Sequence, residues 1–244
     1  MRNVAAFFDI DGTIYRAGLI TAIYKKMIKH ELIESNSWHQ SIKPAFNSWD
    51  KRKGEYDDYL LKLVDAYIET IIGKPSFQIE YIAKRVIEQK GDKVYKFSRN
   101  RIDYHKENNH KVFAISGSPN ELVCEMARKY GMDDFRGTIY KKDEKDCYTG
   151  EIVPMWDSVS KQKSIFDLAD KYNIDLDRSY AYGDTMGDFT MLSLVKYPFA
   201  INPTQALLKN ILQDKDMCQK VTIIVERKDV IYSIKPQELT ILEH

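Results

Sequence analysis

Two carboxylates, Asp9 and Asp11, follow the apolar run at residues 4–8 and are two positions apart. In an extended segment alternate side chains point to the same side, so both acids are expected to face one ligand. Neighbouring carboxylates disfavour each other's ionisation, and a hard divalent cation would compensate them. Gly12 then allows a sharp turn. The pattern predicts a buried strand that ends in an active-site turn, against the alternative of an ordinary strand end followed by a loop.

Polar residues also follow two later segments that are predicted to be strands. Ser116 and Gly117 end the apolar segment 111–116, and Asp184 and Asp188 follow the segment 179–182. Ligands of open parallel sheets bind at the carboxyl ends of the strands, where these residues are expected to meet. Carboxylate oxygens are ligands that Mg²⁺ prefers. Asp184 alone could be a helix cap, but the coincidence of three strand ends favours a ligand site.

Two features after these strands are suited to an anion. The amides that follow Ser116 lie near the start of the next predicted helix, where a phosphate is favoured. Lys161 opens an amphipathic segment and can reach a phosphate as a point charge. A surface lysine is the alternative, because Lys163 stands two positions later.

The chain divides into two kinds of pattern. Apolar residues recur with helical period at 19–28, 59–71 and 79–87, and no strand pattern interrupts them. From residue 93 onward helical and strand patterns alternate, which predicts an α/β fold with a parallel sheet wrapped by helices. We therefore expect a core domain formed by residues 1–15 and 93–244, with an all-helical cap at 16–92 inserted into it.

Composition limits the partners and the compartment. The 37 Lys and Arg residues balance 36 Asp and Glu residues, so no overall charge favours nucleic acid or an anionic membrane. No stretch approaches the roughly 20 apolar residues that span a bilayer. Three cysteines without metal-ligand spacing fit a reducing compartment. A soluble cytoplasmic protein is expected. The histidines show no paired spacing, and His110 is expected to face solvent.

Four motifs together resemble the haloacid dehalogenase (HAD) superfamily. They are DIDGT at residues 9–13, AISGSP at 114–119, Lys161, and YGDTMGD at 182–188. The similarity spans residues 4 to about 203, and its nearest branch is subfamily IB, the phosphoserine-phosphatase-like group. The resemblance implies a Rossmann-like core with a helical cap between the first two motifs, and a phosphoric monoester hydrolase activity.

The resemblance also implies catalytic roles. Asp9 would attack phosphorus to give an aspartyl-phosphate, and Asp11 would protonate the leaving alcohol and then activate water. Lys161 would neutralise charge on the phosphate and the nucleophile. Dehalogenases of the superfamily resemble the phosphatases but lack an acid at the position of Asp11, so a dehalogenase is not expected.

Binding roles follow from the same resemblance. Ser116 and the Gly117 amide would bind phosphoryl oxygens. The Mg²⁺ cofactor would be held by Asp9, the Asp11 carbonyl and Asp184, with Asp188 supporting it directly or through water.

The substrate is expected to be a small phosphorylated metabolite chosen by the cap. Phosphoserine phosphatases resemble this chain in the core but carry a Glu nine residues after the nucleophile, where Gly18 stands here. Phosphoserine is therefore doubtful. Arg16 or Tyr15 is a candidate contact for a substrate anion, with an exposed loop residue as the alternative. A phosphotransferase with the same intermediate and a non-catalytic phosphate sensor are the competing hypotheses.

Overall fold

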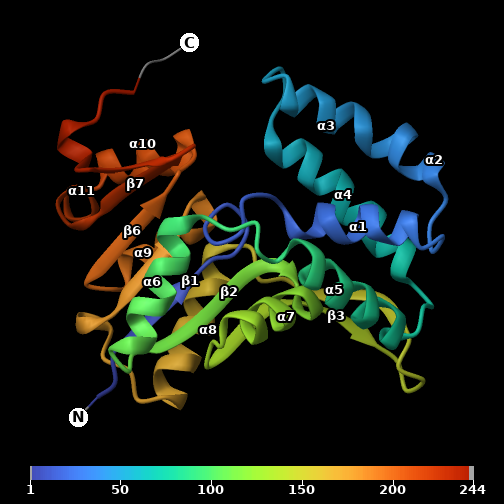
Figure 1. Ribbon diagram of the computed structural model, residues 1–244, viewed down its shortest axis with the longest axis horizontal. Coiled ribbons are helices and arrows are strands. Elements are labelled where there is room, and N and C mark those ends of the chain that lie inside the picture. The colour runs from blue at the N-terminus through green and yellow to red at the C-terminus, as the bar shows by residue number, and fades with distance from the viewer. Residues whose placement is uncertain (1, 242–244) are drawn as a thin grey trace.

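The computed structural model describes residues 2–241, and its centre is a sheet with helices on both faces (Figure 1). The strands are β1 (Ala5–Phe8), β2 (Lys111–Pro119), β3 (Asp134–Lys142), β4 (Tyr148–Val153), β5 (Tyr180–Gly183), β6 (Tyr197–Ile201), β7 (Thr222–Arg227) and β8 (Val230–Ile234). Their order in space is β4-β3-β2-β1-β5-β6-β7-β8. Pairs from β3 to β7 are parallel, and β4 and β8 pair antiparallel at the edges. The expected α/β fold with a mostly parallel sheet is confirmed.

Helices connect these strands in two groups. The helices between β1 and β2 are α1 (Leu19–Lys29), α2 (Ser35–Ser37), a π-helical turn (Trp38–Ile42), α3 (Lys43–Asp50), α4 (Tyr56–Ile71), α5 (Ser76–Lys90) and α6 (Lys96–Glu107). Those after β2 are α7 (Asn120–Tyr130), α8 (Ser158–Lys171), α9 (Phe189–Ser193), α10 (Gln205–Gln213) and α11 (Lys215–Lys220). Short 3₁₀ turns lie at Leu176–Arg178, Met186–Asp188 and Pro236–Glu238.

The central strand β1 contributes to both hydrophobic cores. Its four residues are all buried, as a strand covered on both faces requires. Ala6 and Phe8 belong to one apolar cluster with side chains of α1, α4, α5, α6 and α7. Ala5 and Phe7 belong to the other, with side chains of α8 to α11. The alternation of side chains along β1 thus fixes the strand between two helical layers.

The stretch 16–92 is helical, and its described residues form no β-strand beyond isolated bridges. Its apolar faces join the cluster that covers the sheet, and α5 packs against α7. The hydrophobic core is therefore continuous from the sheet into these helices. The division into a core domain and a cap at 16–92 stays a prediction.

The second predicted strand differs from expectation at its end. Residues 111–116 were expected to stop before Gly117, whereas β2 continues to Pro119 and places Ser116 and Gly117 inside the strand. Continued pairing with β3, which resumes at Pro119 opposite Thr138 after an irregular register, extends the strand. The sequence patterns also missed β8, α10 and α11. None of the helices within residues 2–241 is long and apolar enough to cross a membrane.

Candidate active site

Asp9 lies immediately beyond β1, at the edge of the sheet where β2 and β5 flank it. Its backbone N–H donates to the carbonyl of Tyr182 at 2.9 Å, which continues the pairing with β5. Its side chain is 7% exposed. The strand pairing thus fixes the direction in which this carboxylate points.

The turn after Asp9 brings the first and fourth motifs together. Gly12 has φ of +89°, and a Cβ atom built there would lie 2.1 Å from Asp184 Oδ2. A side chain at this position would therefore collide with the carboxylate as well as strain the backbone. Thr13 Oγ1 donates to Asp184 Oδ1 at 2.9 Å, so the turn also orients this acid.

Three buried acids, Asp9, Asp184 and Asp188, form one cluster. An oxygen from each lies within 4.8 Å of the others, so the three can converge on one metal ion. Burial raises the pKa values of Asp9 and Asp184, and the charges of neighbouring acids raise them further. The single buried ammonium of Lys161 leaves an excess of negative charge, which is costly away from water. A divalent cation with oxygen ligands fits this donor set and this charge.

Lys161 joins two of these acids from the first turns of α8. Its Nζ lies 2.8 Å from Asp9 Oδ1 and 2.5 Å from Asp188 Oδ1. Burial alone would lower the pKa of Lys161, but the charges of Asp188 and Asp9 outweigh it and raise the pKa. Lys163 is exposed, so Lys161 is the lysine that the helix turns into the site.

Asp188 has both carboxylate oxygens occupied by protein donors. Oδ1 accepts from Lys161, while Oδ2 accepts from the backbone N–H groups of Asp184 and Thr185 and from Thr185 Oγ1, at 3.0–3.1 Å. These contacts hold both the turn after β5 and the side chain of Lys161 in place. Asp188 therefore holds the lysine and the turn in place, and its predicted support of the metal, directly or through water, stays a prediction.

Asp11 is held apart from the acid cluster. Its Oδ1 accepts from the backbone N–H of Leu19 at 2.7 Å, and its Oδ2 accepts from Ser118 Oγ. Burial raises the pKa of Asp11 to about 6, with the hydrogen bonds acting in the opposite direction. Within the described chain the side chain of Asp11 is not among the converging metal ligands. The predicted metal contact through its backbone carbonyl stays a prediction.

Ser116 and Gly117 lie on β2, next to β1. Ser116 is fully buried, and its Oγ accepts from the backbone N–H of Ser118 at 3.2 Å. The carbonyl of Gly117 accepts from Thr138 Oγ1 at 2.7 Å, which fixes this irregular part of the strand. The sequence patterns missed Ser118, because the strand was expected to end before Gly117 and Ser118 was read as part of the turn after it.

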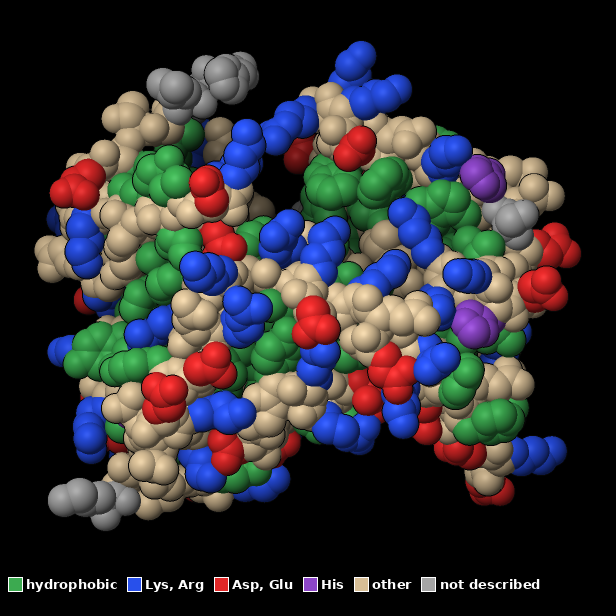
Figure 2. Space-filling view, viewed as in Figure 1, with side chains coloured by type: hydrophobic (Ala, Val, Ile, Leu, Met, Phe, Trp, Pro, Cys, Tyr) green, Lys and Arg blue, Asp and Glu red, His purple; other side chains and the backbone are tan. Residues whose placement is uncertain are grey.

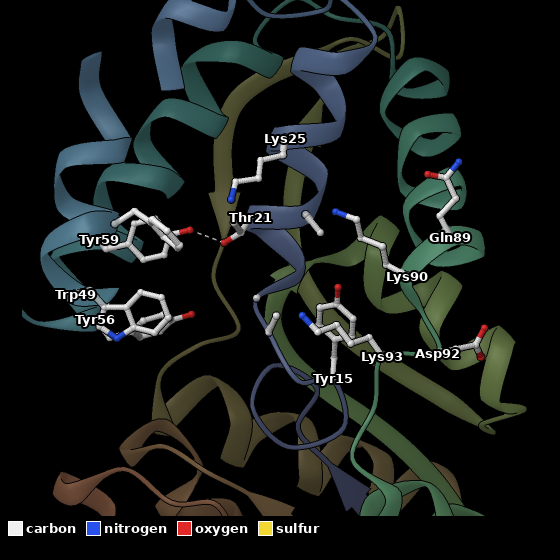
Figure 3. Close-up of a pocket in the computed structure, with 14 residues that line it drawn as sticks. Tyr15, Thr21, Lys25, Trp49, Tyr56, Tyr59, Gln89, Lys90, Asp92 and Lys93 are labelled. Carbon is white, nitrogen blue, oxygen red and sulfur yellow. Dashed lines mark hydrogen bonds between the residues drawn. The ribbon is translucent and has the colours of Figure 1, made fainter. Parts of the chain in front are cut away.

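A cavity of about 410 Å³ lies beyond the Asp11 turn and is called here the Tyr56 cavity. Tyr15 and Gly18 from the turn line one part of it, and Tyr56 from α4 lines another (Figure 3). Arg16 is exposed and is not among its lining residues. The structure therefore separates the two candidate substrate contacts, with Tyr15 inside the cavity and Arg16 outside it.

The sequence that forms this site matches a known protein family. The family model of haloacid dehalogenase-like hydrolases matches residues 6–193, which is most of the chain, and the chain belongs to this hydrolase family. A Streptomyces azureus protein named inhibition of morphological differentiation protein is 27% identical over 212 residues, covering 86% of this chain and 76% of that protein. A phosphoserine phosphatase of Mycobacterium tuberculosis is 30% identical over 125 residues, which cover 51% of this chain and 40% of that protein.

Solved structures share the fold. A Bordetella pertussis protein of unknown function aligns with a TM-score of 0.69 at 14% identity, covering 87% of this chain and 96% of that one. A phospho-aspartyl intermediate analogue of phosphoserine phosphatase aligns with a TM-score of 0.57 at 17% identity, covering 94% and 96%. The resemblance to the HAD superfamily is confirmed, and phosphoserine phosphatases are among the proteins similar in sequence and in fold.

Proposed function

We propose that this protein is a Mg²⁺-dependent phosphatase that hydrolyses a small phosphomonoester through an aspartyl-phosphate on Asp9. The observation that carries the proposal is the contact of buried Lys161 with Asp9, beside a cluster of acids that fits a divalent cation. Phosphoryl transfer needs positioned groups that neutralise oxygen charge more than it needs covalent chemistry from the protein. A carboxylate nucleophile with an adjacent lysine supplies this arrangement.

The reaction proceeds in two displacements at phosphorus. In the first, an Asp9 oxygen forms a bond to phosphorus while the bond to the leaving oxygen breaks, and Asp11 gives that oxygen its proton. In the second, water attacks the phosphorus of the aspartyl-phosphate and gives its proton to Asp11. The bond to Asp9 breaks, and inorganic phosphate leaves. Asp11 ends the cycle protonated, as it began.

The remaining residues of the site would bind the metal ion and the phosphoryl group and orient them for the reaction. Asp9 and Asp184 would hold Mg²⁺, with the Asp11 carbonyl, and Asp188 would support them through Lys161 and the turn after β5. When bound, the ion would supply positive charge that offsets the repulsion between nucleophile and phosphate. Ser116 and the Gly117 amide would bind phosphoryl oxygens beside β1. Lys161 would neutralise negative charge on both the nucleophile and the phosphoryl group.

The first test is phosphate release from a panel of small phosphomonoesters, with Mg²⁺ or with EDTA, by the parent and by Asp9→Asn. We expect release by the parent with Mg²⁺, and none from Asp9→Asn, because an amide oxygen is a poor nucleophile. Asp167→Asn, an exposed change on α8, is the matched control. Release by Asp9→Asn at the parent rate would overturn the proposal. An acceptor alcohol added to the parent reaction separates hydrolysis from phosphotransfer, because only a transferase would form a new phosphoester in preference to phosphate.

A further inference from the structure

The Tyr56 cavity has an aromatic wall formed by α3 and α4. The rings of Trp49 and Tyr59 are stacked at 5.7 Å with 7° between their planes, and Phe46 and Tyr56 pack against them. Tyr59 Oη and Thr21 Oγ1 of α1 are hydrogen-bonded at 2.6 Å, which holds this wall to the neighbouring helix. Flat rings held in place favour contact with a planar apolar group.

Three lysines also line the cavity. Lys90 and Lys93 point toward α1 from the side opposite the aromatic wall, and Lys25 extends from α1 itself (Figure 3). We call these three the cavity lysines. Figure 2 shows a hollow in this face beside α3 and α4, with apolar side chains on its wall and Lys and Arg side chains gathered around it. The cavity thus combines aromatic rings with ammonium groups, and Lys25 Nζ lies 4.9 Å from the centroid of the Phe46 ring.

Lys25, Lys90 and Lys93 give the cavity a local excess of positive charge. Among the described residues no carboxylate forms an ion pair with a cavity lysine. Asp92 is the only acid among the lining residues, and its carboxylate pairs with Lys129 at 2.9 Å. Burial lowers the pKa of Lys25, and the charge of Lys90 lowers it further, so the two ammonium groups repel each other. An anion between them would relieve that repulsion.

The cavity borders the turn that carries Asp11. Gly18 lines the cavity, while the N–H of the next residue, Leu19, donates to Asp11. Tyr15 also lines it, and the carbonyl of Tyr15 accepts from the N–H of Gly12 at 2.9 Å. The cavity therefore lies beside the place where a phosphoester would be held at Asp9, and it is large enough for a small organic leaving group.

We propose that the Tyr56 cavity binds the leaving group of the substrate, and that this group is a planar ring or comparable flat apolar body carrying a second anionic group. The ring lies on the aromatic wall, and the anion, a carboxylate or another phosphate, is bound by the cavity lysines. This inference rests on the proposed phosphatase function and narrows its substrate class. A leaving group with a free ammonium group is disfavoured, because the cavity offers it three lysines and no unpaired carboxylate.

The experiment compares three aryl phosphates that differ in one charge. 4-Methylphenyl phosphate has no charge apart from its phosphate group. 4-(Carboxymethyl)phenyl phosphate carries an additional carboxylate, and 4-(aminomethyl)phenyl phosphate carries an additional ammonium group. The methylene group keeps the leaving oxygens similar, so kcat/KM reports binding of the added charge. We expect the anionic ester to exceed the neutral one by about tenfold, the equivalent of ~1.4 kcal/mol, and the cationic ester to be the poorest.

Variants assign the preference to the cavity. Lys90→Gln with Lys93→Gln should bring the ratio of anionic to neutral ester close to one, whereas Lys84→Gln, an exposed control on the same α5, should keep it. Trp49→Leu should raise KM for all three esters. This inference fails, and the phosphatase function stands, if phosphate release depends on Asp9 but the parent shows a ratio of anionic to neutral ester near one. The same conclusion follows if the double lysine variant keeps the ratio of the parent. If release does not depend on Asp9, the proposed function itself fails.

Discussion

The backbone N–H of Leu19, the first residue of α1, donates to Asp11 Oδ1 at 2.7 Å. An N–H group at the start of a helix has no intrahelical acceptor, so a carboxylate there satisfies it and is stabilised by the helix dipole. The helical stretch after β1 thereby orients the proposed general acid/base, while Ser118 holds its other oxygen. The side chain of Asp11 is a fixed part of the turn that joins the sheet to α1.

Replacing Asp11 by Asn should slow turnover by about 10²- to 10⁴-fold, the usual contribution of a positioned acid or base. The amide oxygen can still accept from Leu19, so the fold should persist. With a good leaving group such as 4-nitrophenolate, protonation is no longer needed, and formation of the phosphoenzyme should outpace its hydrolysis. Rapid-quench kinetics should then show a burst of nitrophenol and a trapped aspartyl-phosphate. A variant without a burst, with both steps slowed equally, would contradict the second role of Asp11.

Asp184 and Asp188 should respond differently to the same Asp→Asn change. Asp184→Asn keeps an oxygen for Thr13 and removes charge from a repulsive cluster, so thermal stability without metal should rise. The Mg²⁺ concentration for half-maximal activity should increase by about 10- to 100-fold. Unchanged Mg²⁺ dependence would remove Asp184 from the metal site.

Asp188→Asn should instead destabilise the fold by about 3 kcal/mol, because it breaks a buried ion pair. Every oxygen position of Asp188 faces a donor, so one NH group of the amide must point at Lys161 or at a backbone N–H. Urea denaturation of the two variants side by side measures the contrast. Equal stability of both would show that Asp188 is not the structural member of the cluster.

The strand-end positions of the acids were predictable because period-two burial and the geometry of parallel sheets are local and general rules. Asp9, Ser116 and Asp184 each follow or end an apolar run, and β2, β1 and β5 are neighbours in the sheet. The apolar pattern of α8 left Lys161 and a surface lysine as alternatives, and the resemblance to the HAD motifs indicated Lys161. The sequence patterns therefore predicted which residues lie together at the carboxyl edge of the sheet.

The partners of those residues depended on tertiary contacts that no local pattern contains. The hydrogen bonds of Asp11 with Ser118 and of Asp184 with Thr13 join segments more than 100 positions apart. The expectation that His110 faces solvent was wrong. His110 is only partly exposed, and its Nδ1 lies 2.9 Å from Nδ1 of His105. That pairing arises because α6 and the start of β2 pack together, which sequence spacing alone does not show.

Buried His105 should make stability fall in mild acid. Burial, together with the charges of Arg101 and His110, lowers its pKa from 6.5 to about 3. Its Nε2 is hydrogen-bonded with Tyr182 Oη at 2.8 Å, and Tyr104 and Tyr180 also contact its ring.

The unfolded chain therefore takes up a proton below about pH 6.5 that the folded chain excludes, and folding free energy is lost as pH falls through that value. This one group should contribute a loss of about 2 kcal/mol between pH 7 and pH 5. Urea denaturation of the parent and His105→Gln at both pH values isolates it, with exposed His30→Gln as the control. Parallel pH dependence in parent and His105→Gln would refute the assignment.

Gly18→Glu should reverse the charge preference of the Tyr56 cavity. Gly18 has φ of −88°, which any residue adopts, and an added Cβ would lie 3.3 Å from Thr21 Oγ1 and 3.5 Å from Tyr56 Oη. The side chain therefore fits with a small shift, and its carboxylate would stand at the N-terminus of α1 among the cavity lysines.

The ratio of kcat/KM for the aminomethyl ester over the carboxymethyl ester should rise by about 100-fold, about tenfold from each charge contact. Gly18→Gln adds the same bulk without the charge and should leave the order of the esters as in the parent. If Glu and Gln change the ratio equally, the effect is steric, and the charge of the cavity does not select the substrate.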